Sequence, residues 1–413
     1  MKPVLCVLLA FTLAVAAAQQ TYYVGIGIED VTGPAADVNM MGYAHPGQTS
    51  RGIHTRQYSR AFIFCDDADG NNCEVFVVVD FAMGATAINL GVLKRLETLY
   101  GNRYTEKNVV ICGTHTHSAP AGFLQYFVFD VTSQGFIHDS YDNFVEGIFQ
   151  SIRMAHESIA PSKVYYNSGE LVGANINRSP YAYEQNPLNE RNDYGSDVDT
   201  TMTVLKITGT DDTDRGLISF FPVHPVSMNN TNRLLSSDNK GYASYLIEME
   251  MNPGTFHGQG EFVAAFANTN QGDVSPNTKG AFCLDTGEEC DRITSTCNGR
   301  TSLCAGVGPG KDMFESTKII GEKQATKAKE LYDDATERIN GPVGFVHQHV
   351  DMTNYEVDLG GGQTGTTCKA AFGYSFAAGA TDGAGFFPFT QAIVIYHGFC
   401  GLCLKPFRVI KKV

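Results

Sequence analysis

Three apolar, strand-like runs of this chain each end in a polar loop that carries a chemically versatile side chain. Residues 108–112 lead to His115 and His117, residues 216–221 to His224, and residues 262–266 to Ser275. In open α/β sheets, ligand sites form beyond the carboxyl ends of the strands, so the three placements agree with one another. Three ordinary turns with satisfied polar side chains are the alternative interpretation.

The first of these loops reads Gly-Thr-His-Thr-His-Ser over residues 113–118. If Thr114 to His117 stay extended, both imidazoles point to the same side of the chain and can face one pocket. Neutral imidazole is a common zinc ligand. The pattern therefore predicts a metal or catalytic site, with two ordinary buried histidines as the alternative.

The remainder of the chain predicts a mixed α/β fold. Runs rich in β-branched and aromatic residues predict strands over residues 22–28, 60–65, 74–81, 164–167, 203–207 and 343–350. Apolar stripes at helical spacing predict helices over residues 85–100, 141–156, 239–251 and 312–334. Gly-rich stretches at 360–362 and 377–385 predict loops. A second H-x-H pair, His347 and His349, lies in one of the predicted strands, and we interpret it as structural.

Composition excludes some partners. The chain has 413 residues and 43% hydrophobic content, enough for one large core or two smaller ones. Its formal net charge of −14, with only 30 Lys and Arg, argues against a nucleic-acid partner. The same acidity argues against electrostatic docking on anionic lipid, so peripheral contact with a membrane surface would depend on apolar side chains.

The first 18 residues have the features of a signal peptide. Lys2 supplies the positive charge, Val4–Val15 the apolar segment, and Ala16–Ala18 the small residues of a cleavage site. We therefore expect residues 1–18 to be removed and the mature protein to be secreted. The alternative is that these residues stay uncleaved and act as a signal anchor. The first strand-like run begins almost immediately afterwards.

Cysteine usage agrees with secretion. Cys283, Cys290, Cys297 and Cys304 recur at every seventh residue of a polar stretch, which predicts two disulfides of undetermined connectivity. A zinc cluster is the alternative, but the CxxC spacing is missing. Glycosylation sequons occur at Asn229 and Asn177, and we expect Asn229 to be the modified one, because Asn177 adjoins a candidate site residue.

Several long phrases of the sequence resemble the neutral ceramidase family, secreted or surface zinc amidases that cut ceramide into sphingosine and a fatty acid. The matching phrases are GIGIEDVTGPAADVNMMGYA, GIHTRQYSRAFIF, CGTHTHSAPAG, GANINRSP, FPVHPVSMNN, TNQGDVSPN and GYSFAAGATDG. They extend in the family's order from about Ile26 to Gln391. The resemblance implies a mixed-sheet α/β ceramidase catalytic domain over residues 19–391, with ceramide as the substrate and Zn²⁺ as the cofactor.

The same resemblance implies roles for individual residues. His115 and His224 would be zinc ligands, and His117 would bind substrate or carry a proton to the leaving amine. Ser275 matches the residue assigned as the nucleophile or its close equivalent; direct attack and orientation of a zinc-bound hydroxide both remain open. Arg178 would contact the polar head of the substrate. The implied disulfides are Cys283–Cys297 and Cys290–Cys304.

The resemblance ends near Gln391, and residues 392–413 form a divergent tail. In the family, two further zinc ligands, a Glu and a Tyr, and a terminal β-sandwich domain follow, and we expect this chain to lack them. Two hypotheses follow. The chain is a zinc-dependent amidohydrolase acting on ceramide, or it is a catalytically impaired secreted fragment that binds lipid or protein partners.

Overall fold

A computed structural model describes residues 20–370, 378–384 and 390. Its main sheet is built from β1 (Tyr22–Asp30), β4 (Tyr58–Cys65), β5 (Cys73–Val79), β6 (Val109–Gly113), β8 (Ala160–Glu170), β10 (Thr201–Gly209), β11 (Asp214–Phe220), β12 (Val263–Ala267) and β16 (Glu337–Arg338). The strand order is β12-β11-β10-β8-β1-β4-β5-β6, with β16 paired to β8. Neighbours are antiparallel except β5–β6 and β11–β12, so the sheet is mixed, as the sequence predicts.

The sheet divides into two halves that pack against each other. β1 and β8 pair only through their first residues, Tyr22–Val24 with Ala160–Ser162, and then run apart. The rings of Phe76 on β5 and Phe220 on β11 lie 5.7 Å apart, in a core that takes side chains from both halves. The ends of β6 and β11 consequently lie at the same end of the molecule.

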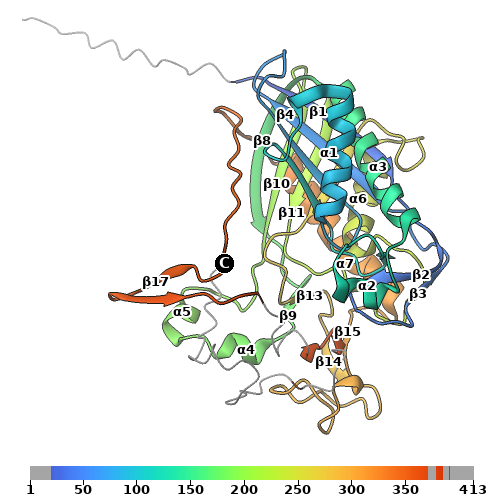
Figure 1. The fold of residues 1–413 in the computed structure, drawn as a ribbon, viewed down its shortest axis with the longest axis vertical. Helices are drawn as coiled ribbons and strands as arrows, with labels where there is room; N and C mark the ends of the chain where they lie inside the picture. Colours follow the sequence, from blue (N-terminus) through green and yellow to red (C-terminus); the bar gives the residue numbers. More distant parts are fainter. Residues whose placement is uncertain (1–19, 371–377, 385–389, 391–413) are drawn as a thin grey trace, which may run out of the picture.

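Helices cover the two outer faces (Figure 1). α1 (Thr86–Tyr100) and α3 (His138–Glu157) pack on the half that contains β4 and β5, while α6 (Asp238–Met251) and α7 (Met313–Asp333) pack on the half that contains β10 to β12. β1 approaches α3 so closely that a Cβ at Gly25 would lie 1.9 Å from the Ala155 carbonyl oxygen. α7 begins where the Asp312 side chain accepts a hydrogen bond from the Glu315 amide at 2.8 Å, an N-cap.

Smaller elements surround the strand ends. The short strands are β2 (Ala36–Met41), β3 (Thr49–Arg51), β7 (Ala119–Pro120), β9 (Ile176–Asn177), β13 (Val274–Ser275), β14 (Gly280–Cys283), β15 (Cys304–Val307), β17 (Glu356–Gly360), β18 (Gln363–Thr366), β19 (Gly379–Ala380) and β20 (Gly383–Ala384). The short helices are α2 (Phe127–Ser133), α4 (Pro180–Glu184), α5 (Leu188–Asn192) and the 3₁₀ turns Gly101–Arg103 and Thr301–Leu303. β9 pairs with β13 beyond the ends of β10 and β11 (Figure 1). None of the helices in the described ranges is both long and apolar enough to cross a bilayer.

Three disulfides link loops and strand ends. Cys65–Cys73 joins the ends of β4 and β5. Cys283–Cys297 and Cys290–Cys304 hold the polar stretch after Ser275 against β14 and β15, in the pairing that the resemblance implies.

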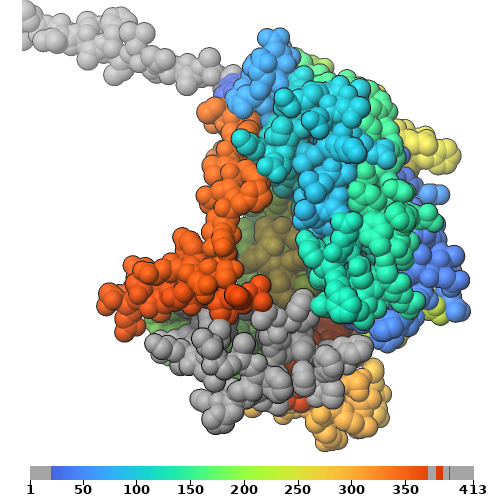
Figure 2. Space-filling model, viewed as in Figure 1, coloured from blue at the N-terminus to red at the C-terminus, as the bar shows by residue number. Residues whose placement is uncertain are grey.

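The predicted helices are confirmed to within a few residues, and so are the predicted strands up to residue 207. The strand predicted over residues 343–350 is wrong: these residues form no strand, and most of them are exposed. After Ile339, whose amide donates to the Val164 carbonyl of β8 at 2.9 Å, the chain leaves β8, and a strand does not persist without a partner for its amides and carbonyls. The segment that follows, including the hairpin β17–β18, projects away from the packed layers (Figure 2).

The loop predicted over residues 377–385 contains the small hairpin β19–β20. The predicted signal peptide, the phrase around residues 372–376 and the divergent tail lie outside the described residues.

Candidate active site

The loop after β6 turns sharply at His115. This residue has φ of +72°, in the left-handed region, so the extended path predicted for Thr114 to His117 is wrong. The turn is fixed by backbone and side-chain hydrogen bonds: the His115 amide donates to the Phe81 carbonyl at 3.0 Å, and Thr116 Oγ1 donates to the Ser236 carbonyl at 2.7 Å. Both histidines nevertheless reach the same site.

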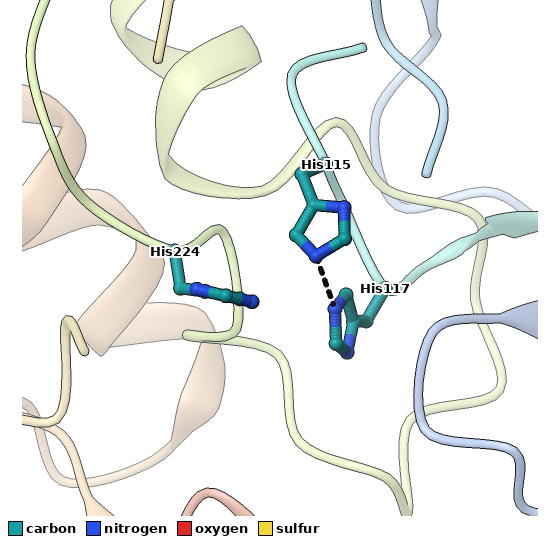
Figure 3. A group of neighbouring side chains, drawn as sticks. All are labelled: His115, His117 and His224. Atoms are coloured by element: carbon teal, nitrogen blue, oxygen red, sulfur yellow. Dashed lines mark hydrogen bonds between the residues drawn. The ribbon is translucent and has the colours of Figure 1, made fainter. Parts of the chain in front are cut away.

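The imidazoles of His115, His117 and His224 face one another (Figure 3). The Nε2 atoms of His115 and His117 are 3.3 Å apart, and the ring of His224 lies 4.7 Å from that of His115 and 5.4 Å from that of His117. One nitrogen from each ring lies within 4.8 Å of the others. Histidines in the loops after β6 and β11, which the sequence predicts to converge, therefore form a group of potential metal ligands.

Hydrogen bonds distinguish the three rings. Nδ1 of His115 bonds the Ala82 carbonyl at 2.5 Å, and Nδ1 of His224 bonds the Gln271 carbonyl at 2.8 Å. A carbonyl can only accept, so each Nδ1 carries the proton and each Nε2 is the unprotonated nitrogen, the arrangement usual for metal-binding histidines. Nδ1 of His117 is buried and has no hydrogen-bond partner among the described residues. His115 and His224 are thus oriented as ligands, while the tautomer of His117 is not fixed in this way.

The site favours neutral imidazoles. Burial lowers the pKa of His115 from its usual value, and it lowers the pKa of His117 and His224 well below it. The neighbouring imidazoles add to the effect at His117, and the Arg178 guanidinium adds to it at His224. Neutral imidazole is the form that binds a metal.

The donor set fits a zinc ion. Three imidazole nitrogens converge without a carboxylate partner among the described residues, and imidazole suits Zn²⁺ among other transition metals. Several buried polar atoms of the surrounding loops also have no hydrogen-bond partner in the described part of the chain: Thr114 Oγ1, His117 Nδ1, Asn268 Oδ1 and Gln271 Oε1. Buried polar groups are normally satisfied, so these atoms indicate a place for a bound group.

Ser275 adjoins the histidines through its own loop. Val274 accepts a hydrogen bond from the His224 amide at 3.2 Å, and Gln271 of the same loop holds the His224 ring. Ser275 Oγ donates to Asp382 Oδ1 at 2.6 Å and accepts from the Asn277 amide at 3.0 Å. Asp382 also lies 3.3 Å from Arg178 Nη1. The structure therefore links Ser275 and Arg178, two predicted site residues, through a carboxylate.

A cavity of about 280 Å³ opens beside these groups. Its walls include Arg178, Ser275, Asn277 and Asp382, together with residues of β14 and of the disulfide-linked stretch. This volume is close to the lower end of the range for small-molecule sites. A polar head and an adjoining amide could enter there, beside Arg178 and Ser275.

Several site residues escape sequence reasoning. Asp382 lies in residues 377–385, a stretch of small residues for which the sequence predicts a loop, and its isolated carboxylate is the available sign of a role. Tyr43 packs edge-on against His117 with ring centroids 4.6 Å apart, and it donates to the Met228 carbonyl at 2.9 Å. Gly42 and Tyr43 sit in a long family-like phrase whose side chains gave no indication of this contact.

Comparison with known proteins identifies the family of this chain. The family model described as neutral/alkaline non-lysosomal ceramidase, N-terminal, matches residues 22–400. The chain belongs to this ceramidase family. Neutral ceramidase B of Dictyostelium discoideum is 51% identical over 379 residues, covering 90% of this chain and 52% of that protein. Neutral ceramidase of Drosophila melanogaster is 42% identical over 386 residues, covering 90% of this chain and 54% of that protein.

Solved ceramidases share the fold. A "Ceramidase complexed with C2" matches with a TM-score of 0.76 and 36% identity, covering 89% of this chain and 53% of that one. The neutral ceramidase of Pseudomonas aeruginosa matches with a TM-score of 0.73 and 36% identity, covering 86% of this chain and 52% of that one. The chain thus spans about half the length of the ceramidases that it matches.

The second H-x-H pair, His347 and His349, lies on the surface and not in the buried histidine group. His347 and His349 are exposed and come close to Glu106 on the surface. The strand that was predicted to carry them is absent, and their interpretation as structural residues stays a prediction.

Proposed function

We propose that the protein is a zinc-dependent amidohydrolase that cleaves the amide bond of ceramide and releases sphingosine and a fatty acid. The observation that carries this proposal is the convergence of three buried or half-buried neutral imidazoles, next to a loop whose Ser275 lines an open cavity. An amide is a poor electrophile, so its cleavage requires a nucleophile, stabilisation of negative charge on oxygen and a proton for the amine. The site offers groups for each task.

His115 and His224 would hold the zinc ion through Nε2, because their Nδ1 atoms are committed to backbone carbonyls. Zinc bound there would supply Lewis-acid polarisation of the amide carbonyl and acidification of water. His117 is the imidazole best placed to exchange protons, since its Nδ1 is not held by a carbonyl. We assign to it the transfer of a proton to the leaving amine.

Arg178 and Ser275 would contact the substrate from the cavity. The Arg178 side chain is anchored by the Gly272 carbonyl at 2.7 Å, yet 18% of it remains exposed at the cavity, where it can bind the hydroxyl groups of a sphingoid head. Ser275 Oγ lies on the same wall and keeps a free lone pair. The arrangement is compatible with attack by Ser275 and with its accepting a hydrogen bond from the reacting groups.

Release of sphingosine from ceramide by the purified chain tests the proposal. Activity should require zinc, disappear with a chelator and fall strongly in His224→Ala, while His349→Ala should retain it as the matched control. The competing hypothesis, a secreted fragment that binds lipid or protein without turning it over, predicts ceramide binding that is indifferent to His224→Ala. Absence of release from folded, zinc-supplied protein would reject the hydrolase.

We also propose that the protein is secreted and glycosylated at Asn229. Three disulfides support an oxidising compartment. Asn229 is exposed, whereas Asn177 is buried and its side-chain amide bonds the Asp197 carbonyl at 3.0 Å. Expression in animal cells should place the chain in the medium with a glycan that Asn229→Gln removes and Asn177→Gln does not. Retention inside the cell would reject secretion.

Peripheral contact with a membrane surface would bring the enzyme to a lipid substrate. α2, which follows the histidine loop in sequence, exposes Phe127 at 82% and Val131 at 61%. Because the chain is acidic, apolar insertion would have to drive this contact. The chain should co-sediment with neutral phosphatidylcholine vesicles, and Phe127→Asp with Val131→Asp should abolish this, while Leu188→Asp on α5 should not. Sedimentation that the α2 changes leave intact would reject this surface.

A further inference from the structure

The hydrogen-bonding capacity of Ser275 Oγ is almost fully used. A hydroxyl has one hydrogen to donate and two lone pairs to accept with. The hydrogen is donated to Asp382 Oδ1 at 2.6 Å, and one lone pair accepts the Asn277 amide at 3.0 Å. One lone pair remains, so Ser275 can accept a hydrogen bond from a ligand or attack it, but it cannot donate to it.

Asp382 is held in place from several directions. Its side chain is 2% exposed. Oδ1 also accepts from Asn277 Nδ2 at 2.7 Å, and Oδ2 faces Arg178 Nη1 at 3.3 Å. Behind it, a Cβ at Gly306 would lie 2.7 Å from Oδ1, so only glycine at that position leaves room for the carboxylate. A buried carboxylate is tolerated when it is paired and hydrogen-bonded, and here all of its described partners belong to the cavity wall.

The hairpin that carries Asp382 also reaches the histidine side. A Cβ at Gly383 would lie 3.0 Å from the ring of Tyr43, which packs on His117. The Gly306 amide donates to the Thr381 carbonyl at 2.7 Å and fixes the hairpin to β15. The hairpin is therefore anchored, and it contacts Ser275 through Asp382 and lies against Tyr43, which packs on His117.

We propose that Asp382 is a positioning residue for Ser275 and Arg178. It accepts the hydrogen bond of the Ser275 hydroxyl, so that the remaining lone pair of Oγ turns toward the cavity, and it holds the Arg178 guanidinium at the cavity wall. The identity of the substrate rests on the proposed ceramidase function, but the arrangement of the three side chains does not. A purely structural Asp382 would only hold the hairpin β19–β20 in place. The two roles predict different behaviour of Ser275.

Covalent labelling of Ser275 by a fluorophosphonate separates these roles. In that reaction the Oγ–P bond forms as the P–F bond breaks, fluoride leaves, and the hydroxyl proton passes to the Asp382 carboxylate. We expect Asp382→Asn, which keeps the size of the side chain, to slow labelling at least about tenfold. Asp285→Asn, an exposed carboxylate paired with Arg300, should leave the rate unchanged. Ser275→Ala should not be labelled, as read by intact mass.

A double-mutant cycle on ceramide hydrolysis gives the second readout. If Asp382 acts through Ser275, Asp382→Asn should lower kcat/KM in the wild-type background and have little effect in Ser275→Ala. Should Asp382→Asn fail to fold, Asp382→Glu keeps the charge but displaces the oxygens, and it should slow labelling as well.

The outcomes are distinct. Equal labelling rates in wild type and in folded Asp382 variants, or no labelling of wild-type Ser275, would overturn the proposal. Labelling that depends on Asp382 without any ceramide turnover would uphold it and would reject the proposed substrate instead.

Discussion

Gly42 leaves open the space that the imidazole of His117 occupies. A Cβ at residue 42 would lie 2.3 Å from Cγ of His117, far inside van der Waals contact. Gly42 also has φ of +129°, a conformation that side-chain-bearing residues rarely adopt. With the ring of Tyr43 on another side, the chain after β2 fixes where His117 lies. The position of an imidazole in the candidate metal site thus depends on a residue without a side chain.

Gly42→Ala is expected to displace His117 and to disturb the whole histidine group. His117 Nε2 lies 3.3 Å from Nε2 of the proposed ligand His115, and disturbing such a neighbour of a metal ligand typically reduces metal affinity about 10–100-fold, so we expect a loss in that range. Competition with a chromophoric chelator measures it. The control is Gly135→Ala, since Gly135 has φ of +112° but no atom within 4 Å of its added Cβ. Wild-type zinc affinity in folded Gly42→Ala would contradict this relationship.

Arg60 is expected to be essential for stability. It lies 1% exposed between Asp80 and Glu248, bonding them at 2.9 Å and 2.8 Å, and so connects β4, the end of β5 and α6. Arg60→Leu would leave two buried carboxylates without their cation, at a cost of about 3–5 kcal/mol in the free energy of unfolding. Urea denaturation measures this.

The matched control for that experiment is Arg95→Leu. Arg95 pairs with Glu146 on the surface, where both side chains are more than 40% exposed. Surface pairs contribute about 0–1 kcal/mol, so the change should be small. Similar losses in the two variants would show that the buried network does not stabilise the fold as described.

Asp238 is expected to make stability depend on pH. It is fully buried at the start of α6, and burial raises its pKa from 3.8 to about 6. Because the folded pKa exceeds the unfolded one, the stability from its protonated form is complete below pH 3.8 and is lost as pH rises through about 6. Asp238→Asn removes this titration, and asparagine tolerates the φ of +53° at this position.

Urea unfolding at about pH 4 and about pH 7.5 tests this effect. The free energy of unfolding of Asp238→Asn relative to wild type should improve by about 2–3 kcal/mol between the two values, because the pKa shift is roughly two units and pH 4 lies just above the unfolded pKa. Asp212→Asn, at an exposed position with φ of +67°, is the control for the backbone conformation. If the difference in the free energy of unfolding between Asp238→Asn and wild type stays constant with pH, the raised pKa of the buried Asp238 carboxyl is contradicted.

The sequence predicts the framework of the site better than its details. Helical periodicity identifies α1, α3, α6 and α7, and apolar runs that end in polar loops predict that His115, His224 and Ser275 converge. These patterns arise from burial of one face of an element, which is visible in local spacing. The route of the histidine loop is not visible, because the left-handed turn at His115 results from its hydrogen bonds to neighbouring segments.

Contacts between distant segments are the other part that the sequence does not reveal. Asp382 meets Ser275 across 107 positions of the chain, and no local pattern encodes that distance. The predicted strand over residues 343–350 is wrong for a related reason, since strand formation depends on a partner and not only on β-forming residues.

Zinc content tests most directly whether His115 and His224 form a metal site. The purified chain should carry about one zinc ion by plasma mass spectrometry, as a single site requires. His115→Ala and His224→Ala should each lose it while remaining folded, and His349→Ala should keep it. A folded wild-type chain without zinc, or a His224→Ala variant that binds zinc as tightly as wild type, would contradict the proposed metal centre.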